Sequence, residues 1–154
     1  MKLSKVELAN TFINKTFEIE TVDLYHQEIK YRDDFVRCIL SCSSTNFGFQ
    51  ISGTYVVRVE NNCDRCTISF EREIKDVLKF WCVTSSKTIS NNDIEIFYMR
   101  NNNDTIDFSS FLSDLISLNR PMKLLCIKNC KGICICCGIN LNNKICLQKD
   151  LIDH

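Results

Sequence analysis

The chain has 154 residues, with 19 basic and 19 acidic side chains, and 45% of its residues are hydrophobic. A chain of this size buries enough surface to fold without covalent cross-links, so we expect residues 1–154 to form a single domain. The composition excludes collagen, a coiled coil and wholesale disorder. No stretch approaches the roughly 18 consecutive apolar residues of a membrane-spanning helix, and residues 1–20 contain no apolar run typical of a signal peptide.

Eleven residues of the chain are cysteines. This odd number excludes complete pairing, and the frequency lies just below the roughly 8–10% that is typical of short disulfide-rich secreted chains. Because no signal peptide is recognised, we expect a reducing compartment. Clustered cysteines in such a compartment more often hold a metal ion or carry out redox chemistry than form disulfides.

The formal net charge is zero, but the charges are unevenly distributed along the chain. Residues 1–118 carry 13 basic and 17 acidic side chains, whereas residues 119–149 carry six basic side chains and no acidic one. The six are Arg120, Lys123, Lys128, Lys131, Lys144 and Lys149. Such an asymmetry indicates a localised anionic partner. Four thiolates on one zinc ion would still leave this segment at about plus four.

Most of the predicted elements are strands. Residues 1–34 are polar with scattered apolar positions and receive no firm assignment, but from residue 35 to 42 the sequence alternates with the period of two that predicts a strand. Gly48 and Gly53 suit a turn or a bulge within the next predicted strand. The further predicted strands are 47–60, 67–74, 76–83 and 94–99, with polar loops at 84–92 and 100–104.

One clear helix is predicted at 108–119. Apolar residues recur there at helical spacing, Asp107 is a suitable N-cap, and Pro121 ends the helix. The expected fold is therefore α+β, with a mainly antiparallel β core and one packed helix over residues 35–118. A basic, cysteine-rich segment held by zinc follows at 119–149.

The cysteines that indicate a metal site fall into two clusters. The first is Cys63-x2-Cys66, between two predicted strands, where two thiolates can face one ion across a tight turn. The second places four cysteines within twelve residues, with Gly132 and Gly138 to permit close turns. The members of the second cluster are Cys126, Cys130, Cys134 and Cys137.

The spacing leaves open which four cysteines share an ion. Cys126, Cys130, Cys134 and Cys137 form one arrangement, and the pairs Cys63/Cys66 and Cys134/Cys137 form another, as in a zinc ribbon. One zinc ion is expected, and two ions are an alternative if Cys146 and a non-cysteine ligand take part. We interpret Cys136 as a spare thiol, because adjacent cysteines rarely bind the same ion. Cys38, Cys42 and Cys82 lie on predicted strands and are expected to be packing residues.

Two other functions of the cysteines are alternatives to a structural zinc site. A small iron–sulfur protein has similar ligand types, and a thiol-redox protein has the spacing of Cys63-x2-Cys66, although no predicted helix follows that pair. Hydrolytic or acid–base catalysis has little support, because His26 and His154 are the only histidines and no phosphate-binding glycine loop is present. We therefore expect that the protein is not an enzyme.

Three segments follow one another in a distinctive order. Residues 53–59 (GTYVVRV) lead into residues 62–66 (NCDRC), Ile106-Asp107-Phe108 opens the predicted helix, and residues 125–134 (LCIKNCKGIC) precede residues 137–142 (CGINLN). In order and spacing these segments resemble the YceD family of large ribosomal RNA subunit accumulation proteins from bacteria and plastids. The chain departs from the family tail at two places. Ile135 and Cys136 stand where the family commonly has a proline after the cysteine, and Gln148 stands where it commonly has a final cysteine.

The resemblance implies a non-enzymatic role in making or stabilising 23S ribosomal RNA during assembly of the large ribosomal subunit. Pre-ribosomal 23S RNA, a large-subunit ribosomal protein, or both are the implied partners, in a bacterial cytoplasm or a plastid stroma. We expect basic residues of the metal-held segment, together with Arg65 between Cys63 and Cys66, to contact RNA phosphates. The candidates for this contact are Arg65, Arg120, Lys123, Lys128, Lys131 and Lys144.

Overall fold

The computed structural model describes residues 2–24, 29–84, 94–99, 101 and 104–147. It contains a six-stranded sheet with the path β2-β4-β5-β6-β7, in which β3 pairs with β5, and a two-stranded sheet formed by β1 and β8. The pairings are antiparallel except for β6 with β7, which is parallel. The fold is α+β, with a mainly antiparallel sheet and one main helix, as predicted.

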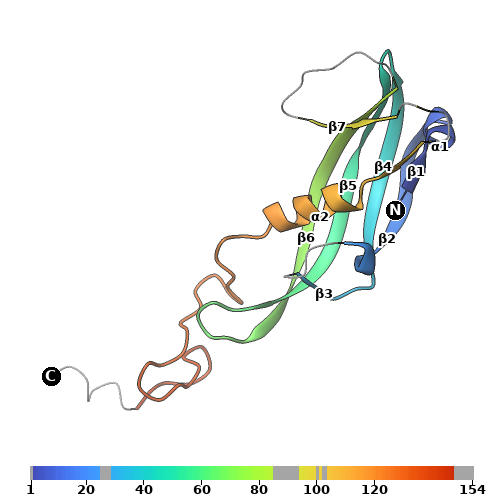
Figure 1. Cartoon of the computed structure of the whole chain (residues 1–154). Helices are drawn as coiled ribbons and strands as arrows, with labels where there is room; N and C mark the ends of the chain where they lie inside the picture. Colours follow the sequence, from blue (N-terminus) through green and yellow to red (C-terminus); the bar gives the residue numbers. More distant parts are fainter. Residues whose placement is uncertain (1, 25–28, 85–93, 100, 102–103, 148–154) are drawn as a thin grey trace.

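The elements follow one another as Figure 1 shows. Their bounds are β1 Lys2–Ser4, α1 Lys5–Ala9, β2 Phe12–Glu20, the 3-10 turn η1 Thr21–Asp23, β3 Lys30–Tyr31, β4 Phe35–Thr45, β5 Gly48–Asn62, β6 Ser69–Val83, β7 Glu95–Tyr98, β8 Thr105–Asp107 and α2 Ser109–Leu118. None of the described helices is long and apolar enough to cross a membrane.

The strands predicted at 35–42 and 94–99 are confirmed as β4 and β7. The prediction of two separate strands at 67–74 and 76–83 is wrong, because the structure has a single strand of 15 residues there, β6. It pairs with β5 without a register shift from Asn62↔Ser69 to Gly48↔Val83, so the ladder continues through Lys75. The predicted loops at 84–92 and 100–104 lie mainly outside the described residues.

Glycine is required at two positions of β5 for different structural reasons. Gly48 begins the strand after the turn from β4 and has a φ of 146°. Gly53 lies in the middle of the strand, between Leu40 of β4 and Leu78 of β6, with no register shift beside it. The bulge predicted as one use of Gly53 is therefore not found. A Cβ atom there would lie 2.0 Å from the Ile39 carbonyl oxygen, so glycine permits the close approach of β4.

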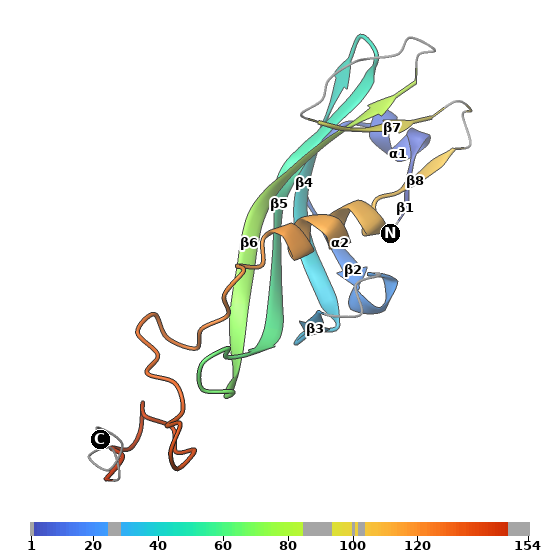
Figure 2. The same cartoon turned by 60° about the vertical axis from the view of Figure 1, so that its left-hand side comes forward.

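The hydrophobic core lies on one face of the six-stranded sheet. Figure 2 shows α2 crossing this face, with the β1–β8 sheet and α1 on the same side. Phe80 of β6 is fully buried and its ring lies 5.4 Å from the ring of Phe108, at the start of α2. On the opposite face Val77 is 67% exposed. Cys38, Cys42 and Cys82 are buried in this core, which confirms them as packing residues.

The predicted helix is confirmed as α2, with slightly different ends. Phe108 rather than Asp107 is the N-cap residue, and the Asp107 carboxylate accepts a hydrogen bond from the Ser109 backbone N–H at 3.0 Å. Ser109 and Ser113, two polar residues that do not belong to the apolar stripe of the helix, are buried. The helix therefore presents a wider face to the core than its apolar residues alone indicate.

The N-terminal residues, which received no assignment from sequence, form β1, α1, β2, η1 and β3. Ser4 and Glu7 form a reciprocal capping box that starts α1. β2 adds to the edge of the sheet beside β4, with an irregularity between Phe12 and Lys15. After α2, residues 119–147 run beyond one end of the sheet and pass beside the loop that joins β5 to β6 (Figures 1 and 2).

Candidate metal centre

The loop between β5 and β6 is a tight turn that carries Cys63 and Cys66. The Cys63 backbone N–H donates to the Ile68 carbonyl at 2.9 Å, and the Thr67 N–H donates to the Cys63 carbonyl at 2.9 Å. Thr67 has a φ of 61°, in the left-handed region that a β-branched residue rarely adopts. We call residues 63–68 the first knuckle. It holds two thiols on one side of a short turn.

The C-terminal segment, residues 119–147, is attached to the first knuckle by hydrogen bonds. The Asp64 N–H donates to the Leu124 carbonyl at 2.8 Å, and the Leu124 N–H donates to an Asp64 carboxylate oxygen at 2.6 Å. The Arg65 guanidinium donates to the Cys130 carbonyl at 2.7 Å. These contacts bring Cys126 and Cys130 to the knuckle.

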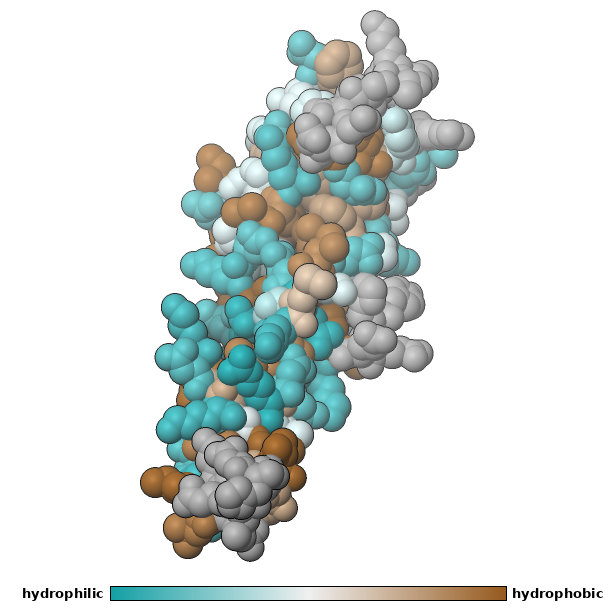
Figure 3. Space-filling model, turned by 90° about the vertical axis from the view of Figure 1, so that its left-hand side faces the viewer, coloured by the Kyte–Doolittle hydropathy of each residue, from teal (hydrophilic) through white to brown (hydrophobic). Residues whose placement is uncertain are grey.

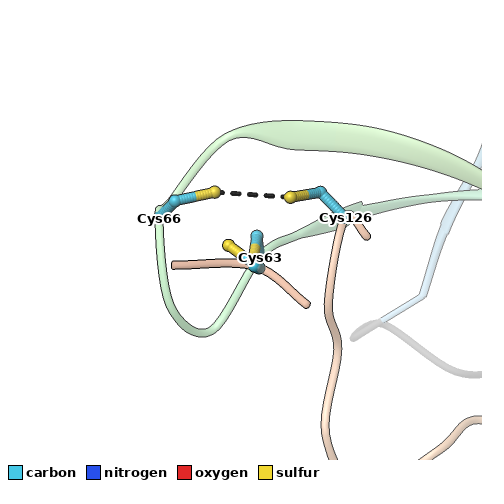
Figure 4. Close-up of side chains that lie close together, drawn as sticks. Cys63, Cys66 and Cys126 are labelled. Carbon is cyan, nitrogen blue, oxygen red and sulfur yellow. Dashed lines mark hydrogen bonds between the residues drawn. The ribbon is translucent and has the colours of Figure 1, made fainter. Parts of the chain in front are cut away.

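The structure gathers Cys63, Cys66, Cys126 and Cys130 into one group, whose sulfur atoms all lie within 4.8 Å of one another. The Cys63 and Cys130 sulfurs are 3.7 Å apart, and those of Cys66 and Cys126 are 3.5 Å apart. Figure 4 shows the thiols of Cys66 and Cys126 pointing at each other between the knuckle and the C-terminal segment. Zinc bound to four sulfurs at about 2.3 Å separates them by about 3.8 Å, so the group fits a tetrahedral zinc ion. We call it the four-thiol centre.

Neither arrangement considered from spacing is the one that the structure forms. Cys134 and Cys137 do not join the first knuckle, and they do not join Cys126 and Cys130. The physical reason is that the C-terminal segment meets the knuckle first at Leu124. The cysteines that immediately follow Leu124 therefore complete the group.

The surroundings of the four thiols affect their ionisation unequally. Burial desolvates Cys63, but backbone hydrogen bonds from Cys126, Cys66 and Arg65 lower its pKa to about 6. A hydrogen bond of 3.2 Å from the Asn142 side-chain amide, together with backbone contacts, lowers the pKa of Cys130. Desolvation and the neighbouring thiols raise the pKa of Cys126 to about 12. Four adjacent thiolates repel one another, so a divalent cation is required for all of them to be ionised together.

A second group, which we call the three-thiol cluster, consists of Cys134, Cys137 and Cys146. Its sulfur atoms also lie within 4.8 Å of one another, and those of Cys137 and Cys146 are 3.5 Å apart. Cys134 and Cys146 are buried, whereas Cys137 is exposed. All six predicted metal ligands thus lie in these two groups, and Cys146 joins the second.

The predicted basic residues lie in the same two segments as the thiol groups, but they are not equivalent. The candidates with exposed side chains are Lys123, Lys128, Lys131, Lys144 and Arg65. Arg65 also holds the Cys130 carbonyl, so it links the knuckle to the segment. Arg120 is half-buried, and its guanidinium donates to the Asn61 side-chain oxygen at 3.4 Å. Arg120 is therefore less available to an external partner than the four lysines.

Large apolar side chains are also exposed beside the three-thiol cluster. Ile135 and Leu147 are each 93% exposed, and Ile145 is 87% exposed. In Figure 3 hydrophobic residues gather at this end of the molecule. The C-terminal segment thus presents both positive charge and apolar surface.

Asn142 and Asp64 are two residues of the centre that sequence reasoning missed. Asn142 contacts the Cys130 sulfur and accepts a hydrogen bond from the Lys131 N–H at 2.8 Å, and Asp64 binds the Leu124 N–H. Both stand in the segments 62–66 and 137–142 that were singled out for their spacing, which was the available signal. His26 and His154 lie outside the described residues.

The comparison with protein families concerns most of β5, the strands β6, β7 and β8, the helix α2 and the whole C-terminal segment. The model of the family described as Large ribosomal RNA subunit accumulation protein YceD matches residues 51–153. The chain belongs to the YceD family. The matched region contains the first knuckle, α2 and both thiol groups, so the family resemblance seen in the sequence is confirmed.

A curated relative of the YceD family is similar over a short stretch. The maize protein named "Large ribosomal RNA subunit accumulation protein YCED homolog 1, chloroplastic" is 46% identical over 37 residues, which are 24% of this chain and 13% of the maize protein. The match thus spans only a small part of that relative's length. No solved structure matches the chain.

Proposed function

We propose that this protein is a non-enzymatic assembly factor that promotes the accumulation or processing of 23S ribosomal RNA in the large ribosomal subunit. The observation that carries the proposal is the family match over residues 51–153, since the family and the maize relative are both named for large ribosomal RNA subunit accumulation. The relative's name supports a plastid stroma as the site of action, with a bacterial cytoplasm as the alternative.

In this proposal, zinc bound by Cys63, Cys66, Cys126 and Cys130 fixes the C-terminal segment to the end of the β5–β6 hairpin. The sulfur–sulfur distances and the hydrogen bond from Asn142 to Cys130 support this role. Among the described residues, the apolar side chains packed against the four thiols are the half-buried Phe70 and Leu125, so hydrophobic burial contributes little here. The segment is then part of a single domain rather than a domain of its own.

The basic face of the segment is the proposed contact with RNA. Lys123, Lys128, Lys131 and Lys144 are exposed, and no acidic residue lies between Asn119 and Lys149 to oppose them. Phosphate contacts of this kind release counterions, so binding weakens as salt rises. An RNA-binding role therefore predicts salt-dependent affinity for large-subunit ribosomal RNA.

The RNA contact is tested by replacing Lys123, Lys128 and Lys131 together with Glu. We expect weaker binding to a 23S ribosomal RNA fragment and a smaller dependence of affinity on salt. The matched control replaces Lys30, Lys75 and Lys79 with Glu, because these three are exposed on the sheet. Equal losses in both triple variants, or no loss in either, would contradict a contact at the C-terminal segment.

The role in the ribosome is tested by depletion. We expect a lower ratio of 23S to 16S ribosomal RNA and fewer large subunits on a sucrose gradient, both restored by the wild-type gene. Normal subunit profiles in depleted cells would overturn the assembly role, whatever the result of the RNA-binding assay.

A large-subunit ribosomal protein is a second candidate partner. The exposed side chains of Ile135, Ile145 and Leu147 favour it, because RNA phosphates do not require apolar surface. Replacing these three with Ser should leave RNA affinity unchanged and reduce co-sedimentation with ribosomal particles. The iron–sulfur and thiol-redox alternatives are tested on the purified protein by its visible absorption and by the reactivity of Cys63.

A further inference from the structure

The turn from Cys134 to Ile139 repeats the backbone geometry of the first knuckle. The Cys134 N–H donates to the Ile139 carbonyl at 2.8 Å, as Cys63 does to Ile68, and the Gly138 N–H donates to the Cys134 carbonyl at 2.9 Å, as Thr67 does to Cys63. Gly138 has a φ of 70°, close to the 61° of Thr67. We call residues 134–139 the second knuckle.

The second knuckle also faces a thiol from outside the turn. The first knuckle meets Cys126 and Cys130, whereas the second meets Cys146. A short ladder closes the second knuckle, in which the Leu141 N–H donates to the Gly132 carbonyl at 2.9 Å and Ile133 pairs with Asn140. A turn then follows, in which the Lys144 N–H donates to the Asn140 carbonyl at 3.1 Å, and the Cys146 sulfur lies 3.5 Å from that of Cys137. The three thiols therefore converge because the backbone is folded around them.

We propose that Cys134, Cys137 and Cys146 bind a second zinc ion whose fourth coordination position is open to a small ligand from solution. Among the described residues, no fourth His, Cys, Asp or Glu joins the three sulfurs within 4.8 Å. Cys136 lies in the same turn and its thiol interacts with those of Cys134 and Cys146, but it does not lie within 4.8 Å of all three sulfurs. The exposure of Cys137 places the open position towards solvent.

The two sites differ in whether the protein fills all four coordination positions of the ion. In the four-thiol centre Cys63, Cys66 and Cys130 are buried, and four sulfurs close the coordination sphere. The three-thiol cluster supplies three sulfurs, so a bound zinc ion keeps a water at the fourth position. A thiolate or an imidazole can replace that water, and the second ion exchanges faster than the first. This inference deepens the proposed zinc-dependent function, and its test does not depend on RNA.

The number of ions is tested by metal analysis of the full chain, loaded with zinc under reducing conditions and then dialysed. We expect two zinc ions in the wild type and one in Cys134→Ser, with two retained in the control Cys136→Ser. One ion in the wild type that is lost in Cys63→Ser would overturn the second site and leave the proposed function intact. A zinc-free wild-type protein would overturn both.

The open position is tested with cobalt, whose visible spectrum reports its ligands. We expect imidazole to change the spectrum of the two-cobalt wild type, and to leave that of one-cobalt Cys134→Ser unchanged. His154→Ala should respond like the wild type. No response in the wild type, with a response appearing only in Cys136→Ser or His154→Ala, would show that one of these side chains fills the position. A Cys137–Cys146 disulfide found by mass analysis of the reduced, zinc-loaded protein would also overturn the proposal.

Discussion

The sheet and the C-terminal segment are stabilised in different ways. A continuous core of buried apolar side chains lies against the sheet and includes Leu40, Tyr55 and Phe80 of the sheet as well as residues of α1, α2 and the β1–β8 sheet. Around the first knuckle, the buried core consists of cysteines with half-buried Phe70 and Leu125 beside them. Where apolar burial is this small, order must come from hydrogen bonds and from metal–thiolate bonds. The difference predicts that the two regions respond to different perturbations.

Removal of metal should have the largest effect, and only on the C-terminal segment. A strong chelator is expected to abolish the protection of amides at 124–147 against hydrogen exchange, while amides of β4, β5 and β6 stay protected. Hydrogen exchange read by mass spectrometry measures both regions in one sample. Loss of protection in the sheet as well would show that the two regions are not energetically separate.

The complementary change is Phe80→Ala in the sheet. Phe80 is fully buried against Phe97, Phe108 and Phe111, so the variant should lose about 3–5 kcal/mol of unfolding free energy. Urea unfolding measures the loss, and metal analysis of the folded fraction should show unchanged zinc. Val77→Ala is the control. Val77 lies on the same strand as Phe80 but is 67% exposed, so its replacement should change the unfolding free energy by no more than about 0.5 kcal/mol.

Asn142→Leu should have an intermediate effect on the four-thiol centre. The variant removes the amide that donates to the Cys130 sulfur at 3.2 Å, and such supporting groups typically change metal affinity about 10–100-fold. Competition with a colorimetric chelator measures the affinity. Asn129→Leu, at an exposed position of the same segment, is the control. Unchanged affinity in Asn142→Leu would mean that the hydrogen bond does not support the metal.

The smallest effect is expected at the surface of the sheet, from Asp33→Asn. The Arg58 guanidinium donates to Asp33 at 2.6 and 2.8 Å and holds the pKa of this carboxyl below its usual range. The stabilisation is therefore present above the ordinary pKa of Asp, about 3.9, and is lost as the pH falls through the lowered value. The stability difference between wild type and variant should be small at neutral pH and should disappear in acid, as measured by urea unfolding. A difference that grew in acid would contradict this sign.

Local sequence patterns predicted much of the sheet and the helix. The alternation in 35–42 and the helical spacing after Asp107 reflect burial on one face, which the order of residues records directly. The same signal could not show that β6 is continuous, because a mixed polar and apolar stretch around Lys75 is held in the strand by its neighbour β5. The N-terminal strands were also missed, since β2 is an edge strand in which Ile19 is the one buried residue.

The order of residues alone shows which residue types are concentrated in the C-terminal segment and predicts two short turns that carry cysteines. The grouping of those cysteines was decided only by the tertiary structure, because it depends on where residues 119–147 first meet the β5–β6 loop. Hydrogen bonds of Asp64 and Arg65 fix that meeting point, and they place Cys126 and Cys130 beside the first knuckle. Cys134, Cys137 and Cys146 are left to form a group of their own. Spacing along a chain restricts which thiols can meet, but contacts between distant segments select among the combinations that remain.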